Sequence, residues 1–448
     1  MVVGKLFGTD GVRGVANTQL TPELAMALGR AVVGAIGHRG DARPVIVVGR
    51  DPRASGALLE GALVAGIMSA GGDALVTGVI PTPAVAFLTR HYRAAAGAVI
   101  SASHNAMPDN GIKFFGPEGF KFPDEVEAKV EAALDLPDQS APRPTGAGVG
   151  RVSPAPDAAE AYLAHLLEGV PALTGLKLVA DCAHGAAAAI GPEAYRRAGA
   201  EVVAIGCDPD GENINDGIGS THPEQVQAEV VRTGAALGLA HDGDADRLIA
   251  VDERGEIVDG DAILAIAACD ERDRGGLAGD TVVTTVMTNL GFRRAMAEQG
   301  IAVVQTAVGD RYVLEAMRAG GHTLGGEQSG HIIYLDRATT GDGILTALRL
   351  LAVMARTGKP LSELARVMER MPQVLVNVRV GDRDGLAGAT EITEAVAAEE
   401  ARLGDRGRVL VRPSGTEPLV RVMVEAETLD EAQAVTDRLA KVVAATLG

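Results

Sequence analysis

Short apolar runs alternate with amphipathic stretches over most of the chain. A β-branched run, Val45–Val48, is followed by an amphipathic stretch, Gly56–Ala70, and by a second apolar run, Ala74–Thr77. A third run, Ala98–Ile100, comes after a longer connection and leads directly into polar residues. Continuous apolar runs of this length, separated by helical patterns, are typical of buried parallel strands joined by helices. The pattern therefore predicts an α/β fold.

The same order of elements recurs twice further along the chain. Each repeat has two strands joined by a helix, a longer connection, and a third strand that ends in a polar loop. The strands are expected at Lys177–Ala180, Glu201–Ile205 and Leu237–Ala240, and again at Thr281–Thr285, Ala302–Gln305 and Thr323–Leu324. Units of about 100 residues predict three related α/β domains with mixed, mostly parallel sheets. An ordinary α/β protein with similar spacing is the alternative.

The last part of the chain has a different pattern. After a break at Met371–Pro372, three strands and two helices are expected, in the order Gln373–Val380, Ala389–Leu403, Arg408–Arg412, Leu419–Glu427 and Leu429–Leu447. This order predicts a small α+β domain with antiparallel strands. Changes in composition divide the chain into domains at 1–150, 151–255, 256–370 and 371–448.

The charge and the cysteines narrow the classes of function. The chain has 448 residues, with 41 Lys and Arg against 59 Asp and Glu, a net charge of −18. An acidic chain without a basic block disfavours nucleic acid and anionic membranes as partners. Three cysteines far apart in sequence, Cys182, Cys207 and Cys269, form neither a disulfide framework nor a thiolate zinc site. No stretch reads as a signal peptide or a membrane span, so we expect a cytoplasmic protein.

Four polar loops follow predicted strands, one in each domain. In open α/β sheets ligands bind beyond the carboxyl ends of the strands, so these loops are candidate sites. The first is Ser101–Asn105, with Lys113 a few residues further on. A hydroxyl on a tight turn beside a histidine suits a nucleophile or a phosphate carrier. A serine turn with a hydrogen-bonded histidine is the structural alternative.

The second loop crowds three carboxylates together. Asp242, Asp244 and Asp246 alternate with small residues, and this arrangement is costly without a cation. Ligation by oxygen alone suits Mg²⁺. An EF-hand would place Glu253 at its twelfth position, but its sixth position is Arg247 and not glycine. A solvated acidic turn is the other alternative, and we predict a metal site.

The third and fourth loops suit a phosphorylated sugar. Gly325–His331 carries Glu, Ser and His among glycines, which suits hydrogen bonds to sugar hydroxyls or to an amine, although a plain turn has the same composition. Arg412–Pro418, followed by Arg421, places hydroxyls and backbone N–H groups between two arginines and predicts a phosphate clamp. With the hydroxyl and the metal site, these loops indicate a phosphosugar mutase. A metal phosphatase and a non-catalytic sugar-phosphate-binding protein remain as alternatives.

Five segments, in order, resemble the α-D-phosphohexomutase superfamily. They are Leu6–Gly14, Ile100–Phe115, Asp242–Arg247, Gly325–His331 and Arg412–Glu425. Within the superfamily they look most like the bacterial branch that acts on glucosamine phosphates, and Gln328 favours that branch. Ala106 departs from the resemblance, because the family usually has proline there, and we expect a slightly looser turn. A phosphomannomutase or phosphoglucomutase of the same superfamily is the alternative.

The resemblance implies a role for each site residue. Ser103 would be a phosphoserine, and Asp242, Asp244 and Asp246 would bind one Mg²⁺ per chain together with its phosphate. The residues implied at the transfer centre are Arg13, His104 and Lys113, with Lys113 as general acid or base and Arg247 facing them. Those implied to hold the substrate are Glu327, Ser329 and His331 for the sugar, and Arg412, Ser414, Gly415, Thr416 and Arg421 for the distal phosphate.

The implied reaction interconverts α-D-glucosamine 6-phosphate and α-D-glucosamine 1-phosphate, on the way to UDP-N-acetylglucosamine and the cell wall. A sugar 1,6-bisphosphate would be the intermediate and activator. The resemblance also implies four domains around a central active site, with phosphoserine, metal-binding, sugar-binding and phosphate-binding domains in chain order. It leaves the oligomeric state open, with a homodimer as one option.

Overall fold

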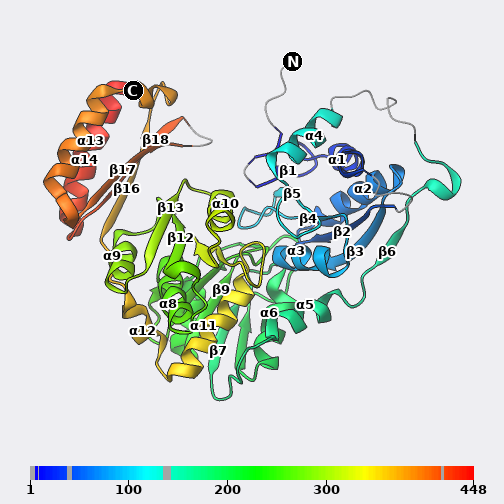
Figure 1. Ribbon diagram of the computed structural model, residues 1–448, viewed down its shortest axis with the longest axis horizontal. Coiled ribbons are helices and arrows are strands. Elements are labelled where there is room, and N and C mark those ends of the chain that lie inside the picture. The colour runs from blue at the N-terminus through cyan, green and yellow to red at the C-terminus, as the bar shows by residue number, and fades with distance from the viewer. Residues whose placement is uncertain (1–5, 9, 38–42, 135–142, 415–417) are drawn as a thin grey trace. The chain divides into compact units, whose positions relative to one another are not determined.

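The computed structural model describes the chain except residues 1–5, 9, 38–42, 135–142 and 415–417. It divides into two compact units (Figure 1). The first unit comprises Met1–Met287 with Ile301–Val367, and the second comprises Thr288–Gly300 with Met368–Gly448. Three sheets lie in the first unit and a three-stranded sheet lies in the second.

The first sheet has six strands in the order β1-β5-β4-β2-β3-β6. Its strands are β1 (Val12–Val15), β2 (Val45–Arg50), β3 (Asp73–Val79), β4 (Ala96–Ile100), β5 (Asp109–Phe115) and β6 (Val152–Pro154). Its helices are α1 (Pro22–Ile36), α2 (Gly56–Ser69), α3 (Thr82–His91) and α4 (Asp124–Leu134). β4, β2, β3 and β6 run parallel, and β5 and β1 are antiparallel. Every residue of β4 is buried, which explains its continuous apolar run.

The second and third sheets also combine parallel strands with antiparallel strands at one edge. The second has the order β11-β10-β9-β7-β8 and the third the order β13-β12-β14-β15. Their strands are β7 (Lys177–Asp181), β8 (Glu201–Ile205), β9 (Leu237–His241), β10 (Leu248–Asp252), β11 (Ile257–Val258), β12 (Thr281–Thr285), β13 (Ala302–Thr306), β14 (Leu324–Gly326) and β15 (Ile332–Tyr334). In the second sheet β9 pairs in parallel with β7 on one side and antiparallel with β10 on the other. In the third sheet β14 pairs in the same way with β12 and with β15. The prediction of three related α/β domains with mixed, mostly parallel sheets is confirmed.

The shared topology places three of the polar loops at equivalent positions. Residues 101–108 connect β4 to β5, residues 242–247 connect β9 to β10, and residues 327–331 connect β14 to β15. Each loop therefore follows the carboxyl end of a parallel strand and returns into an antiparallel one. This is the position at which open α/β sheets bind ligands.

Helix α11 (Gly343–Thr357) packs across the second and third domains. It contacts α5 (Ala158–Leu167), α6 (Ala187–Arg197), α8 (Gly260–Asp273) and β10. Its N-cap, Asp342, accepts hydrogen bonds from the Leu345 N–H at 2.9 Å and from the buried Tyr162 hydroxyl at 2.7 Å. The remaining helices of this unit are α7 (Glu224–Thr233), α10 (Asp310–Gly320) and α12 (Leu361–Leu364).

The second unit has an antiparallel sheet, as predicted for the last part of the chain, with helices on one face. The strands β16 (Gln373–Arg379), β18 (Leu419–Glu425) and β17 (Arg408–Pro413) lie side by side in that order, backed by α13 (Thr390–Leu403) and α14 (Leu429–Leu447) (Figure 1). Helix α9 (Leu290–Glu298) also belongs to this unit. The buried Glu425 carboxylate holds it, accepting from Leu290 N–H at 2.9 Å and from Asn289 Nδ2 at 3.2 Å.

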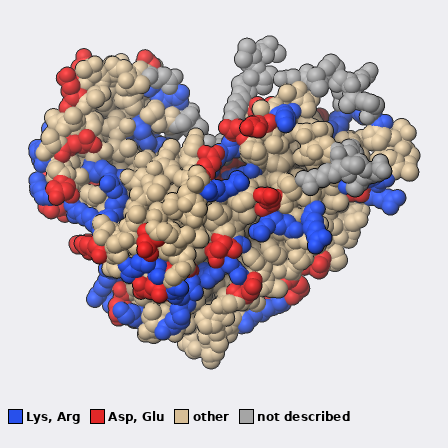
Figure 2. Space-filling model, in the orientation of Figure 1, with Lys and Arg blue, Asp and Glu red and all other residues tan. Residues whose placement is uncertain are grey.

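No helix in the described parts of the chain is long and apolar enough to cross a membrane. On the face drawn in Figure 2, acidic and basic side chains are interspersed.

Candidate active site

Ser103 lies at the tip of the first polar loop and is buried, with 1% of its surface exposed. Its backbone has φ of 53°, in the left-handed region that residues with a Cβ rarely adopt. Its hydroxyl donates a hydrogen bond to Asp242 Oδ2 at 2.6 Å, and His104 Nδ1 lies 3.4 Å from the same oxygen atom of the serine. The fold thus joins the first polar loop to the acidic loop of the next domain.

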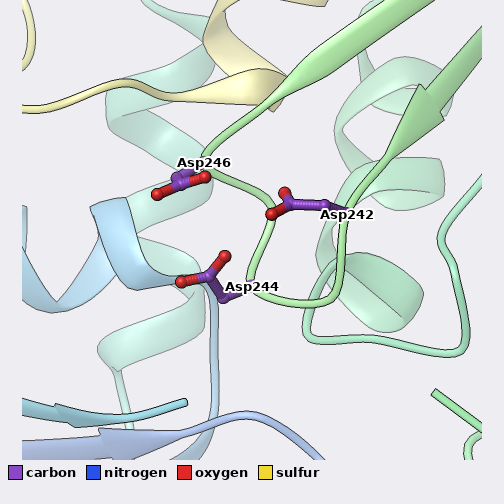
Figure 3. Close-up of side chains that lie close together, drawn as sticks. All are labelled: Asp242, Asp244 and Asp246. Carbon is purple, nitrogen blue, oxygen red and sulfur yellow. The ribbon is translucent and has the colours of Figure 1, made fainter. Parts of the chain in front are cut away.

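The three carboxylates of the acidic loop converge in a buried position (Figure 3). Each of Asp242, Asp244 and Asp246 offers an oxygen within 4.8 Å of the others. Asp244 Oδ1 and Asp246 Oδ1 are buried, and neither has a hydrogen-bond partner in the described part of the chain. Burial, and then the two neighbouring carboxylates, raise the pKa of Asp242 well above its ordinary value. Unpartnered buried oxygens and mutual repulsion are what a bound divalent cation relieves, so these residues fit a metal.

The acidic loop is held against the first domain by close backbone contacts. A Cβ on Gly243 would lie 2.6 Å from the Ser103 carbonyl oxygen, so only glycine fits there. The Thr82 hydroxyl at the start of α3 donates to Asp244 Oδ2 at 2.6 Å, and its N–H donates to the Asp244 carbonyl at 3.0 Å. Thr82 was not predicted from the sequence. It stands between two prolines, and this pattern does not indicate a contact with an aspartate.

Lys113, on β5, is buried between two carboxylates. Its Nζ lies 3.0 Å from Asp10 Oδ2 and 3.2 Å from Asp244 Oδ2. Burial acts to lower the pKa of Lys113, but Asp10 and then Asp244 outweigh it, and the pKa is raised. Lys113 therefore carries its proton. Asp10 also pairs with Arg13. This aspartate lies inside Leu6–Gly14, one of the five segments that resemble the superfamily.

His104 and Arg247 face the same carboxylates. Burial, followed by the charges of Arg247 and Arg13, lowers the pKa of His104 to about 4, so its imidazole is neutral near pH 7. Arg247 Nε lies 3.7 Å from Asp246 Oδ1. The residues predicted for the transfer centre therefore lie close together, around the acidic loop.

The sugar-type loop adjoins the acidic loop. His331 is buried, with Nδ1 at 3.5 Å from Asp246 Oδ2. The Gly341 N–H donates to its Nε2 at 3.0 Å, and its Nδ1 faces Asp246. Glu327 accepts from the Gly309 N–H at 3.1 Å, and burial raises its pKa. The Ser329 hydroxyl oxygen is buried and finds no hydrogen-bond partner in the ranges that the structure describes, which leaves it available to a ligand.

A further ion-pair chain links the first and third domains. Lys121 Nζ lies 2.7 Å from Asp10 Oδ1 and also pairs with Asp310. Asp310 Oδ2 lies 3.6 Å from His331 Nε2. Neither Lys121 nor Asp310 stands in a motif, so sequence reasoning had no signal for them.

The predicted phosphate clamp lies in the second unit. Arg412 on β17 and Arg421 on β18 are direct neighbours across the sheet. Arg421 Nε is buried and has no hydrogen-bond partner among the residues that the structure describes. Burial together with the Arg421 charge lowers the pKa of Arg412. Ser414 is buried beside them, while Gly415 and Thr416 lie outside the described residues. Like charges on adjacent strands repel, so this pair suits an anion.

Four family models match the chain in sequence order. All describe phosphoglucomutase/phosphomannomutase: α/β/α domain I at residues 4–140, domain II at 160–255, domain III at 259–371 and the C-terminal domain at 375–442.

Curated relatives match over the full length. The phosphoglucosamine mutase of Streptomyces griseus is 59% identical, with 100% of both chains covered. That of Saccharopolyspora erythraea is 58% identical, covering 99% of this chain and 100% of the relative.

Solved structures share the fold. A phosphoglucomutase/phosphomannomutase family protein from Burkholderia thailandensis has a TM-score of 0.83 at 26% identity, covering 100% of this chain and 98% of that one. An N-acetylphosphoglucosamine mutase from Aspergillus fumigatus, in complex with GlcNAc-6P and magnesium, has a TM-score of 0.69 at 18% identity, covering 99% and 96%. The chain belongs to the phosphoglucomutase/phosphomannomutase family of phosphohexomutases.

Proposed function

We propose that this enzyme interconverts α-D-glucosamine 6-phosphate and α-D-glucosamine 1-phosphate on the route to UDP-N-acetylglucosamine. Full-length relatives of this activity are 57–59% identical to the chain. The observation that carries the chemistry is the buried Ser103 hydroxyl, which lies 2.6 Å from an aspartate of a buried acidic triad. A serine so placed is suited to carry a phosphoryl group.

In this proposal Ser103 is phosphorylated in the resting enzyme, and Asp242, Asp244 and Asp246 hold Mg²⁺. The metal, when bound, neutralises phosphoryl charge during transfer. Transfer breaks the bond between Ser103 Oγ and phosphorus as a sugar oxygen bonds to phosphorus, the sugar hydroxyl gives up its proton, and the serine oxygen regains one. Lys113, held protonated by Asp10 and Asp244, serves first as the general acid that gives its proton to the serine oxygen, and then as the base that takes the proton of the sugar hydroxyl.

The remaining residues position the substrate. Glu327, Ser329 and His331 hold the sugar, Arg13, His104 and Arg247 contact the transferring phosphoryl group, and Arg412, Ser414, Gly415, Thr416 and Arg421 hold the idle phosphate. One serine must serve both ends of the sugar, so the 1,6-bisphosphate intermediate has to turn end for end between the two transfers. We propose phosphoserine, metal-binding, sugar-binding and phosphate-binding domains at 1–150, 151–255, 256–370 and 371–448.

The test is an assay of glucosamine, glucose and mannose 6-phosphates with purified enzyme, together with intact mass and phosphopeptide mapping. We expect turnover to be fastest with glucosamine 6-phosphate and a phosphopeptide containing phospho-Ser103. The family models also cover phosphoglucomutase and phosphomannomutase, and a preference for glucose or mannose phosphate would select that activity instead. Binding of sugar phosphate without turnover would exclude a mutase.

Gly243→Ala should nearly abolish turnover without removing any functional group. The added Cβ would lie 2.6 Å from the Ser103 carbonyl oxygen and 2.8 Å from Asn215 Nδ2, so the two loops must separate. A displacement of about 1 Å in a transfer centre costs about a hundredfold in rate. Initial rates and thermal unfolding check this. Gly61→Ala is the control, because no described residue lies within 4 Å of a Cβ there. Equal rates for both variants would contradict the close approach of the loops.

Arg421→Ala should weaken substrate binding and release the intermediate. A charge-assisted hydrogen bond contributes ~1.5–3 kcal/mol, so KM should rise roughly tenfold to a hundredfold. The variant should also leak glucosamine 1,6-bisphosphate, and added bisphosphate should partly restore turnover. Exposed Arg379, at the end of β16, gives a matched control, Arg379→Ala. An unchanged KM for Arg421→Ala would remove this arginine from the site.

A further inference from the structure

Arg53 is one of the largest fully buried side chains in the described part of the chain, with 1% of its surface exposed. It follows β2, in the first domain. Its Nε donates to Asp51 Oδ2 at 2.9 Å, and both side chains are fully buried. A buried arginine away from solvent is uncommon and needs partners for every donor.

All five N–H groups of this guanidinium are used. One goes to Asp51, three go to backbone carbonyls of the loop that carries Ser103, and one goes to the carbonyl of Asp109, the first residue of β5. The Nη2 atom donates to the carbonyls of Ser103 at 3.0 Å and Asn105 at 2.8 Å. The Nη1 atom donates to those of Ala106 at 2.5 Å and Asp109 at 3.1 Å. The planar guanidinium, with its five donors, therefore binds several backbone carbonyls near Ser103 at the same time.

The same cluster reaches the Ser103 backbone by a second route. Asp51 Oδ2 also accepts from the Ser101 hydroxyl at 2.7 Å, and the Ser101 oxygen in turn accepts from the Ser103 N–H at 2.9 Å. Arg53 thus fixes the carbonyl of Ser103 directly and its N–H through Asp51 and Ser101. Ser103 has φ of 53°, a conformation that costs of the order of 1–3 kcal/mol and persists only where surrounding contacts impose it.

We infer that Arg53 is the positioning residue of the phosphoryl-carrying loop: its guanidinium imposes the backbone conformation that holds the Ser103 hydroxyl against Asp242. The inference rests on the proposed function, because it matters to catalysis only if Ser103 carries the phosphoryl group. Arg53 does not contact the Ser103 hydroxyl, so it acts through the backbone. Lysine cannot replace it, since an ammonium has three donors on one nitrogen and cannot reach four carbonyls and a carboxylate.

The test compares Arg53→Lys and Arg53→Ala with the wild type. Phosphoryl transfer depends mainly on position, so we expect kcat to fall about a hundredfold or more in both variants, with KM for glucosamine 6-phosphate changed less than threefold. Phosphorylation of Ser103 by glucose 1,6-bisphosphate, followed by intact mass, should slow by a similar factor. Guanidinium chloride at low concentration should raise the kcat of Arg53→Ala at least tenfold.

The control is Leu63→Ala, which removes a fully buried leucine from the core of the same domain and lowers thermal stability without touching the loop. It should keep kcat close to wild type and show no guanidinium rescue. Hydrogen exchange should be faster at residues 101–111 in Arg53→Lys than in either the wild type or Leu63→Ala, and this readout applies even if Arg53→Ala does not fold.

The outcomes separate the two proposals. Arg53 variants that keep kcat within about threefold, or that lose it only as much as Leu63→Ala at matched stability, overturn the inference. A rise in KM with unchanged kcat also overturns it, because that result places the effect on substrate binding. If wild-type enzyme turns over but carries its phosphate on another residue, the Ser103 assignment falls, and the inference falls with it.

Discussion

Replacing Ser103 by alanine should reduce mutase activity to below about a thousandth of wild type, a barrier increase of ~4 kcal/mol. The hydroxyl lies 2.6 Å from Asp242, and alanine has no oxygen to carry a phosphoryl group. The fold should survive, since serine and alanine meet the same backbone cost at φ of 53°. The measurements are the initial rate with added 1,6-bisphosphate, the intact mass and the thermal midpoint in Mg²⁺.

Ser69→Ala is a matched control for this variant. The Ser69 hydroxyl donates to the Gly66 carbonyl within α2, in the same domain but outside the loop. It should keep wild-type activity and the phosphoserine mass. A Ser103→Ala enzyme with more than about a tenth of wild-type rate, a barrier change under ~1.4 kcal/mol, would contradict the carrier role. A phosphopeptide mapped to Ser101 would contradict it as well.

Replacing Asp242 by asparagine should leave the fold at least as stable in EDTA, yet slow turnover by at least about a thousandfold. Burial and the two neighbouring carboxylates disfavour its charge. Asparagine removes that repulsion and can still accept from the Arg247 N–H, which donates to Asp242 Oδ1 at 3.2 Å. The loss of a ligand should abolish the rise in thermal midpoint that Mg²⁺ produces in the wild type.

Asp244 is less suited to this experiment, because its carboxylate also balances the buried charge of Lys113. The control is Asp252→Asn, at the far end of β10, where the carboxylate accepts from the backbone N–H groups of Arg254 and Glu256 in a turn. That variant should keep the stabilisation by Mg²⁺. Wild-type activity that is equal in EDTA and in Mg²⁺ would exclude a metal from the reaction.

The local pattern of the chain was enough to predict the parallel strands that repeat in the first three domains, and the polar loops that follow them. Apolar runs such as Ala98–Ile100 mark buried strands because every residue of β4 is buried, on both faces of the sheet. Glycine and polar residues at their ends mark the turns. The spacing of Asp242, Asp244 and Asp246 indicated a metal site because three charges on one short loop repel wherever that loop lies.

Which serine faces the carboxylates could not be read from the letters alone. Ser101 and Ser103 stand two residues apart, and either could carry a phosphoryl group. The fold separates them, since Ser101 donates to Asp51 while Ser103 donates to Asp242 from another domain. The resemblance to a family had favoured Ser103, but the physical reason lies in the packing of the two loops.

The residues that the sequence did not indicate are those whose partners lie far away in the chain. Arg53 reaches a loop some fifty residues on, and Thr82 meets Asp244 at a separation of 162 residues. Lys121 and Asp310 are separated by 189 residues. Periodicity reports how a side chain stands relative to its own strand or helix, whereas these contacts depend on how whole sheets pack. The sequence therefore determined the repeated strand and helix pattern and the chemistry of each loop. The tertiary structure alone decided which charges meet.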